Sequence, residues 1–440
     1  MPQRETVFDK ARSLEKKYDW LKAADLYEQA LLDVGKNDYL KRGEIQEKIG
    51  HCFHKVAMQA ESREEFKQRM QRAAEAYEKA GELYEKLAEE QEARSFRSRA
   101  VAKYLGFWLT SNPSERRGLL DECLELADKA LAIFSESRDM QEYGRTFNAL
   151  SSDLSVFFLR WVHEWDRQVI EEVAEKGVRW GEKAVTALSE LGDPHSSAVA
   201  HLDVATCLLT LTWFAIADPE VQEQHREKAL RYINKAIDLS EKAGDAYFLG
   251  LSHFWLGFNM EGDESIRRFE KTLECGEETR DIFMKALALD FLAYAIYWKA
   301  IETEDPDQRR KLAEKAMQFY DKAQHLCSII SFISPRGGLI SPPGGYTEHY
   351  FYLAEWETDP EKKIDFLRKS EKNGLEALKV AENSEVPVAI AFMLHILSKM
   401  FTARARLQPD LDEKRSLLEK ALRYIERSIG MYVQWKPFAY

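Results

Sequence analysis

The chain has 440 residues, of which 45% are hydrophobic and 31% charged, a composition typical of a folded globular protein and not of a disordered or collagen-like one. Its 21 Gly and 12 Pro are few for this length, so we expect few turns and long helices. The formal net charge of −12 disfavours a nucleic-acid-binding surface, because phosphate binding requires clustered Lys and Arg.

The cysteines and the apolar stretches bear on the compartment. The odd number of cysteines and the absence of a CxxC pair indicate reduced thiols, and hence a cytoplasmic protein. The N-terminal residues lack the apolar core of a secretory signal, and no apolar stretch is long enough to cross a bilayer. We therefore expect no membrane contact. The acidic central surface would tolerate a basic partner, although solubility is the more usual role of such charge. The cysteines are Cys52, Cys123, Cys207, Cys275 and Cys327.

A short helical pattern recurs along the chain, as in YEQAL at Tyr27 and GEKAV at Gly181. Successive copies lie 50 to 55 residues apart, except for one step of 36 between Ala236 and Thr272. The chain is thus predicted to contain eight or nine units, one of them short. The fourth residues of the copies, used here as markers, are Ala30, Ala80, Ala130, Ala184, Ala236, Thr272, Ala323, Asn373 and Ser428.

Each unit carries further fixed positions around its marker. A small residue lies seven positions before the marker in most units, and a bulky residue lies three before it. These positions share one face of a helix, where small side chains let a neighbouring helix approach closely. The small residues are Ala23, Ala73, Gly177, Ala229, Ser265, Ala316 and Ala421.

Four consecutive units have an aspartate nine residues after the marker: Asp139, Asp193, Asp245 and Asp281. Gly or Arg precedes it. Gly can take the left-handed conformation at a helix end, and Asp can cap the next helix by accepting a backbone N–H. A long apolar segment then runs to a Pro-containing punctuation. Each unit is therefore predicted to pair a short amphipathic helix with an apolar helix of about 20–23 residues.

The first unit, KKYDWLKAADLYEQAL from Lys16, resembles the tetratricopeptide repeat (TPR) family, and Trp-Leu-Gly-Phe at Trp255 resembles its first-helix signature. The period near 50 exceeds the family's 34. Longer units are similar to the TPR-like helical sheets of soluble fusion-attachment adaptor proteins. The resemblance implies an all-α, right-handed α-solenoid of about eight or nine antiparallel hairpins, one domain over residues 1–440. It also implies peptide or protein binding on the concave side, without enzymatic activity.

The sequence offers little catalytic or metal-binding chemistry. His51 and His54 have a chelating spacing, but no third ligand follows at helical spacing. The sequence contains no GxSxG, HExxH or CxxC motif, and no Gly-rich phosphate loop. We expect neither an enzyme nor a bound cofactor or metal.

Isolated polar residues recur eight to ten positions after the capping aspartates, inside apolar helices. A polar group there is costly unless it is hydrogen-bonded or faces water. One interpretation is a mildly acidic groove wall that binds a basic or amide-rich peptide. The other, given equal weight, is hydrogen bonding between neighbouring helices. The residues are Asn148, His201, Asp203, His253 and Asp290.

Aromatic residues and one irregular segment complete the pattern. Trp108, Trp161, Trp213, Trp298 and Trp356 recur near the ends of the apolar helices and are predicted to fill the gaps between hairpins. Ser331–Tyr346 has three Pro and four Gly and is predicted to be an inserted loop, with Arg336, Leu339 and Tyr346 over the groove. It could plug the groove, cover a ligand, or pack outside.

The predicted function is a non-enzymatic interaction scaffold or adaptor that binds a protein or peptide segment in its concave groove. The alternative is a sensor that binds a small molecule or signal peptide and relays a shape change to an output domain. The aromatic C-terminal residues MYVQWKPFAY either pack back on the last hairpin or mark an edge where a further domain or subunit docks.

Overall fold

A computed structural model describes residues 6–87, 91–110, 112–161, 167–214, 218–330, 342–383 and 387–434. These residues form α-helices and turns without a β-strand. The helices are α1 (Val7–Glu15), α2 (Trp20–Asp33), α3 (Tyr39–Ala57), α4 (Arg63–Glu85), α5 (Glu92–Gly106), α6 (Pro113–Glu136), α7 (Met140–Trp161), α8 (Arg167–Leu191), α9 (Pro194–Phe214), α10 (Pro219–Ala243), α11 (Ala246–Phe258), α12 (Gly262–Thr279), α13 (Ile282–Glu302), α14 (Pro306–Ile330), α15 (Pro342–Trp356), α16 (Pro360–Asn383), α17 (Pro387–Leu407) and α18 (Leu411–Gln434).

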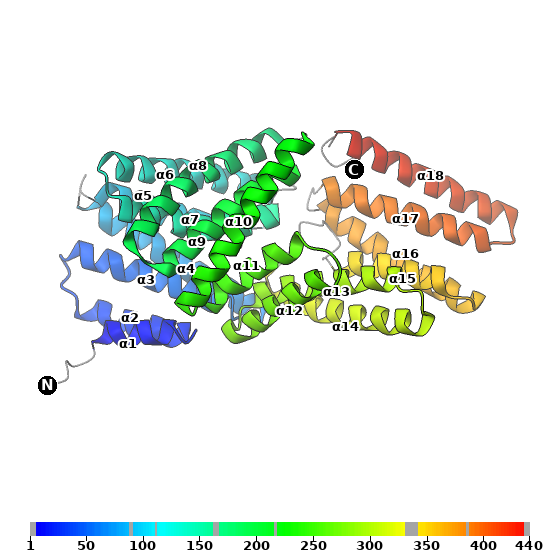
Figure 1. Cartoon of the computed structure of the whole chain (residues 1–440), viewed down its shortest axis with the longest axis horizontal. Helices are drawn as coiled ribbons and strands as arrows, with labels where there is room; N and C mark the ends of the chain where they lie inside the picture. Colours follow the sequence, from blue (N-terminus) through cyan, green and yellow to red (C-terminus); the bar gives the residue numbers. More distant parts are fainter. Residues whose placement is uncertain are drawn as a thin grey trace.

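Consecutive helices pair as antiparallel hairpins, α1 with α2 through α17 with α18, and the hairpins stack in chain order (Figure 1). This confirms the predicted all-α solenoid of TPR-like hairpins. The apolar helices α9 and α13 have 21 residues each, as predicted. The amphipathic helices are not short, however, since α10 and α14 have 25 residues each.

The predicted caps are confirmed, but they lie between successive hairpins and not inside them, because they join α6 to α7, α8 to α9, α10 to α11 and α12 to α13. Gly244 has a left-handed φ of 65° and ends α10, and Asp245 accepts hydrogen bonds from the backbone N–H groups of Tyr247 and Phe248. Gly192, with a φ of 68°, and Asp193 repeat this arrangement before α9. The other two aspartates, Asp139 and Asp281, also cap their helices.

The small residues of the repeat are buried where helices approach closely. At Gly177, an added Cβ would lie 2.5 Å from the Cys207 sulfur on α9, so only glycine fits there. One marker is misplaced: Asn373 is not the buried small residue of α16. That helix instead buries Ser370 and Ala377, which have the same spacing of seven.

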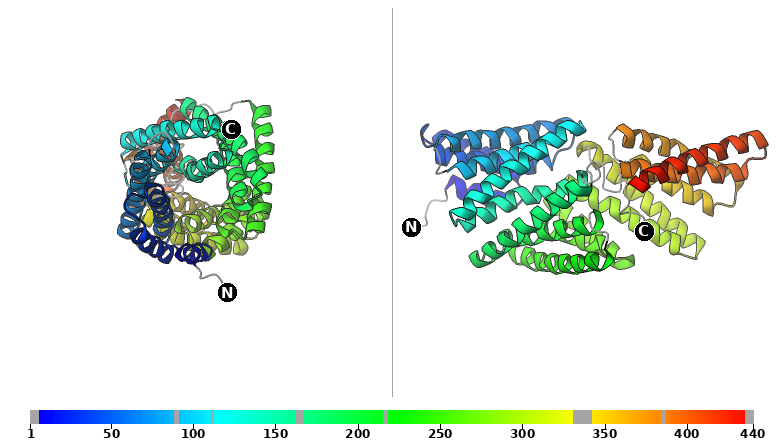
Figure 2. Two further views of the ribbon diagram at one scale, coloured as in Figure 1. Left: turned by 90° about the vertical axis from the view of Figure 1, so that its left-hand side faces the viewer. Right: turned by 90° about the horizontal axis from the view of Figure 1, so that it is seen from above.

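The stacked hairpins curve until the N-terminal helices meet α11–α14. Viewed along the long axis, helices from blue to yellow follow one another around a ring (Figure 2). The N–H of Ile282 donates to the Met58 carbonyl at 2.8 Å, and Gln59 Nε2 donates to the carbonyls of Tyr18 and Thr279. The N–H of Ala246 donates to the Tyr18 hydroxyl. We call these bonds the closing contact.

Replacing Gln59 by alanine should loosen the closing contact. Two hydrogen bonds to backbone carbonyls are lost, at a cost of about 1–3 kcal/mol. Hydrogen exchange at the Ile282 amide should then accelerate, because that N–H is held by Met58 across the contact. Gln71→Ala removes a bond to Glu75 within one exposed helix face and is the control. Unchanged exchange at Ile282 in Gln59→Ala would contradict the assignment.

A buried ion cluster connects the first helices of three successive hairpins. Arg97 on α5 is only 8% exposed and donates to both Glu47 on α3 and Glu142 on α7, the latter at 2.7 Å. Ser98 also donates to Glu47. Each buried charge therefore has an oppositely charged partner on another helix, which fixes how these helices stack.

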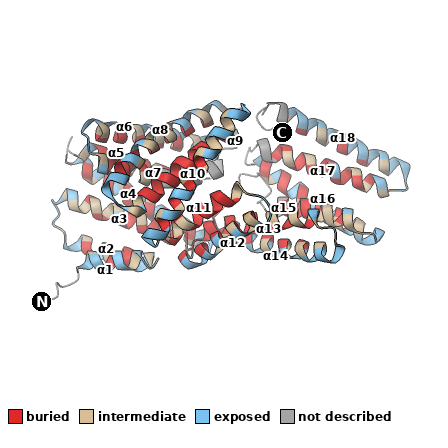
Figure 3. Cartoon of the chain, in the orientation of Figure 1, coloured by how far each residue is buried: buried red, intermediate tan, exposed pale blue. Residues whose placement is uncertain are grey.

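The buried apolar residues form two main clusters. One runs from α1 to α14, and the other joins α15 to α18. Buried residues predominate on the first helices of the hairpins, such as α9 and α13, and exposed residues are more frequent on second helices such as α10 and α18 (Figure 3). Smaller clusters with Tyr346 and Tyr352 of α15 link the two. That residues 1–440 form a single domain stays a prediction.

Candidate functional site

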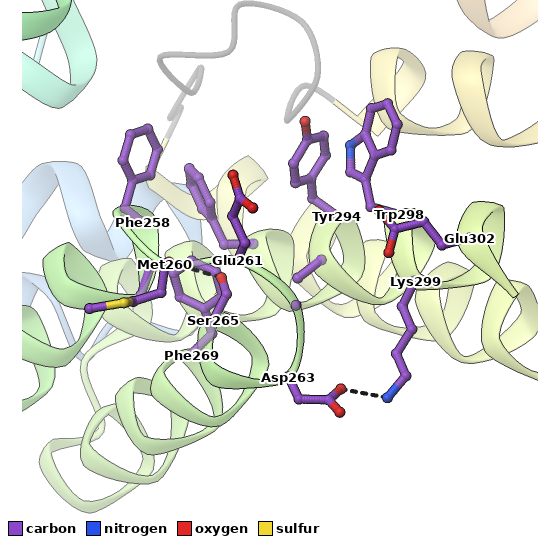
Figure 4. Close-up of a pocket in the computed structure, with 14 residues that line it drawn as sticks. Phe258, Met260, Glu261, Asp263, Ser265, Phe269, Tyr294, Trp298, Lys299 and Glu302 are labelled. Atoms are coloured by element: carbon purple, nitrogen blue, oxygen red, sulfur yellow. Dashed lines mark hydrogen bonds and ion pairs between the residues drawn. The ribbon is translucent and has the colours of Figure 1, made fainter.

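A cleft of about 590 Å³ lies between the end of α11, the start of α12 and the second half of α13 (Figure 4). It exists because α11 is short. α11 has 13 residues, or about 20 Å, whereas α13 has 21, or about 31 Å. The last turns of α13 therefore extend beyond α11. This is the unit whose step of 36 residues stands out in the sequence.

The turn between α11 and α12 shapes the near side of the cleft. Gly262 has a φ of 59°, a conformation that L side chains rarely adopt. The Ser265 hydroxyl donates to the Gly257 carbonyl at 2.8 Å and holds α12 against the end of α11. The chain thus reverses directly at the cleft without a long loop.

Aromatic rings form the floor of the cleft. The Phe291 ring on α13 lies 5.3 Å from that of Phe258 and 5.4 Å from that of Phe269. Phe258 also lies 4.5 Å from Trp213 on α9, which stacks on Trp255. The floor is therefore continuous with an aromatic cluster between hairpins and is held rigidly.

Tyr294 and Trp298 of α13 form the wall above this floor. Figure 4 shows both side chains projecting to the same side as Phe258. Their rings lie 5.9 Å apart, and Trp298 is 38% exposed. An exposed tryptophan beside a hollow of this kind is typical of binding surfaces.

The rim of the cleft is acidic. Glu261, Asp263 and Glu302 supply three carboxylates, against the single ammonium group of Lys299. Lys299 is paired with Asp263, and this hydrogen bond lowers the pKa of Asp263. The cleft can hold an apolar or aromatic group on its floor and a cationic group between its rings and rim carboxylates.

The five polar residues predicted to line a groove lie on successive first helices, from α7 to α13. Half-buried Asn148 donates to the Ser196 carbonyl on α9 at 2.9 Å. His201 is buried and its Nδ1 lies 2.7 Å from the Ser197 carbonyl of its own helix. Burial lowers the pKa of His201.

His253, Asp203 and Asp290 are also buried. His253 Nδ1 lies 3.3 Å from Nη1 of Arg268 on α12, and burial together with that charge lowers the pKa of His253 to about 4. Burial raises the pKa of the Cys207 and Cys327 thiols, and the nearby Asp203 and Asp290 carboxylates add to it. Asn148 and His253 contact neighbouring helices, as the packing interpretation expects, whereas the contact of His201 is within its own helix. A role of the five residues in ligand binding stays a prediction.

The inserted segment is shorter than predicted. Arg336 and Leu339 lie outside the described residues. Tyr346 does not belong to a loop, because α15 begins at Pro342. Its side chain is buried and its hydroxyl donates to Asp321 on α14. Tyr346 therefore helps to join α14 to α15.

The predicted plugging role holds for some of the tryptophans. Trp108 is buried between Phe66 and Phe283, and Trp213 packs on α11. Trp298 differs, since its side chain is 38% exposed. The side chain of Trp161 lies outside the described residues. In the described part of the chain, no group of three His, Cys, Asp or Glu side chains is placed to hold a metal.

No protein-family model matches the sequence, and no curated protein matches it. A signal transduction ATPase with numerous domains and a tetratricopeptide repeat sensor, from Pyrococcus horikoshii, superposes with a TM-score of 0.50 at 15% identity. The match covers 96% of this chain and 54% of that one, so this chain spans about half of its length. A circular tandem repeat protein with a novel repeat topology gives a TM-score of 0.29 at 13% identity, covering 95% and 92% of the two chains.

The fold is therefore a TPR-like helical repeat. None of the described helices is both long and apolar enough to cross a membrane. All five cysteines are buried, in agreement with their prediction as core thiols.

Proposed function

We propose that this chain is a non-enzymatic interaction module that binds a segment of a protein partner in the cleft between α11 and α13. The observation that carries the proposal is the exposed Trp298 above an aromatic floor. Binding energy at protein interfaces concentrates on aromatic anchors of this kind. The acidic rim favours a partner segment with a basic residue next to an apolar or aromatic one.

A sensor function is the second candidate. The superposed P. horikoshii protein is described as having a TPR sensor, and this chain spans 54% of its length. The cleft volume of about 590 Å³ also lies within the range of roughly 300–1,000 Å³ typical of small-molecule sites. In that case the cleft takes a small cationic aromatic compound, and an output domain reads the resulting shape.

A thermal-shift panel separates the two functions. A ligand that binds only the folded state stabilises it by about 2.7 kcal/mol at a hundredfold excess over its Kd. We expect basic-aromatic peptides to raise the melting temperature and acidic peptides of the same length to leave it unchanged. Stabilisation by small cationic metabolites, with none by any peptide, would favour the sensor.

A further inference from the structure

α18 lies at the edge of the molecule (Figure 1), and an apolar stripe runs along one exposed face of this helix. Leu411, Leu418, Leu422 and Ile429 are 78%, 44%, 56% and 54% exposed. Their spacings of seven, four and seven place them on one side of the helix, as in a coiled-coil seam. Isolated exposed leucines are ordinary, but four aligned on one helix indicate an interface.

The corresponding face is buried on two other helices that come second in their hairpins, α6 and α16. Each of these helices has two buried small residues seven positions apart. The positions that correspond to the stripe lie three residues before the first of them and one residue after the second. On α6 and α16 these positions are buried, with exposures between 0% and 6%, whereas on α18 they are exposed. The stripe is thus a surface that α6 and α16 bury within the stack. The residues are Leu120 and Leu131 on α6, Leu367 and Leu378 on α16, and Leu418 and Ile429 on α18.

One position of the stripe differs from the corresponding face of α16. The residue of α16 that corresponds to Leu422 is Glu371, which binds Arg404 on the next helix, α17. On α18 an apolar side chain takes the place of this carboxylate. The face is therefore suited to an apolar helix surface like itself and not to a hairpin that brings an arginine.

We propose that α18 pairs antiparallel with α18 of a second copy of the chain across a two-fold axis. The pattern is nearly symmetric about Lys420. In this register, Leu418 lies opposite the partner's Leu422, and Leu411 lies opposite the partner's Ile429. Arg415, whose side chain is 81% exposed and binds Glu419 of its own helix, lies one residue away from the position opposite the partner's Glu426. The two-fold axis repeats this arrangement, so the charges flanking the stripe are complementary to themselves.

Light scattering after size exclusion, over a wide range of protein concentration, tests the pairing. The full chain should approach a mass twice its 51.0 kDa as concentration rises. Leu422→Glu should remain a monomer at every concentration. Leu32 on α2 is 85% exposed but outside the stripe, so Leu32→Glu is the matched control and should dimerise like the unaltered chain. Helix content by circular dichroism checks that all variants fold.

A charge exchange distinguishes self-pairing from any other partner. Arg415→Glu and Glu426→Arg should each weaken the dimer roughly tenfold or more, because each places like charges close to one another. An equimolar mixture of the two variants should form a heterodimer, since both ion pairs are then restored with reversed polarity. A chain that stays monomeric at all concentrations overturns the proposal. So does a dimer that survives Leu422→Glu, or a mixture that fails to recombine.

Discussion

Replacing Arg97 by methionine is expected to lower the free energy of unfolding by about 3–5 kcal/mol, since removal of one partner leaves buried charge uncompensated. Arg97 is 8% exposed and contacts Glu47 and Glu142 on two other helices. Methionine keeps much of the side-chain volume, so the loss reports on charge more than on packing. Denaturant unfolding measures this loss as a lower transition midpoint at an unchanged m-value.

The cluster also makes stability depend on acid. Burial by itself raises the pKa of Glu142, but the charge of Arg97 and its hydrogen bond outweigh this and lower the pKa to about 2 from an ordinary 4.5. A carboxyl with a depressed folded-state pKa stabilises the fold above its unfolded pKa. That stability is lost as pH falls from about 4.5 to about 2. Arg97→Met should flatten the pH dependence of unfolding in this window.

Arg145→Ala is the matched control for Arg97, because it removes an arginine from the same carboxylate. Arg145 binds Glu142 from the surface, with a side chain that is 55% exposed. Exposed ion pairs contribute about 0–1 kcal/mol, so this variant should unfold almost like the original chain. Equal losses in the two variants would contradict the view that the buried pairs hold α3, α5 and α7 together.

Replacing Trp298 by alanine should weaken binding of a cleft ligand about a hundredfold, as truncation of a central aromatic anchor costs about 2–4 kcal/mol. The ligand is a basic-aromatic peptide selected on the unaltered chain. Trp298 is 38% exposed, so its loss should change the melting temperature little. Titration by fluorescence anisotropy of the labelled peptide measures the dissociation constant.

Two further variants sharpen the Trp298 result. Trp298→Phe keeps a ring on the wall and should recover most of the affinity. Leu32→Ala changes another exposed apolar residue, far from the cleft in sequence, and should leave affinity unchanged. If Trp298→Ala bound the selected peptide as tightly as the original chain, the wall of the cleft would have no part in recognition.

The sequence was sufficient for the architecture because the signals are local. Caps such as Asp193 and Asp245, and small residues such as Gly177, act between helices that follow one another in the chain. The length of the amphipathic helices was underestimated because the recurring strings mark only the residues on their buried face. The marker at Asn373 failed because Ser370 and Ala377 offer the same spacing three and four residues away.

The candidate site could not be predicted in the same way. The 36-residue step announced a short unit, but not how the shortening is divided between its two helices, α11 with 13 residues and α12 with 18. The two interpretations of His253 and Asp290, groove wall and helix packing, stayed open because apolar periodicity does not show whether a polar residue faces solvent or a neighbouring helix. Closure of the ring, through Met58 and Ile282, depends on residues more than 200 positions apart.

Parallel selection of displayed random peptides on the unaltered chain and on Trp298→Ala tests the central claim most directly. We predict that the unaltered chain enriches peptides with an aromatic or large apolar residue beside Lys or Arg, and that the variant does not enrich them. Enrichment of the same peptides on both chains, or of acidic peptides on the unaltered chain, would contradict recognition through the α11–α13 cleft.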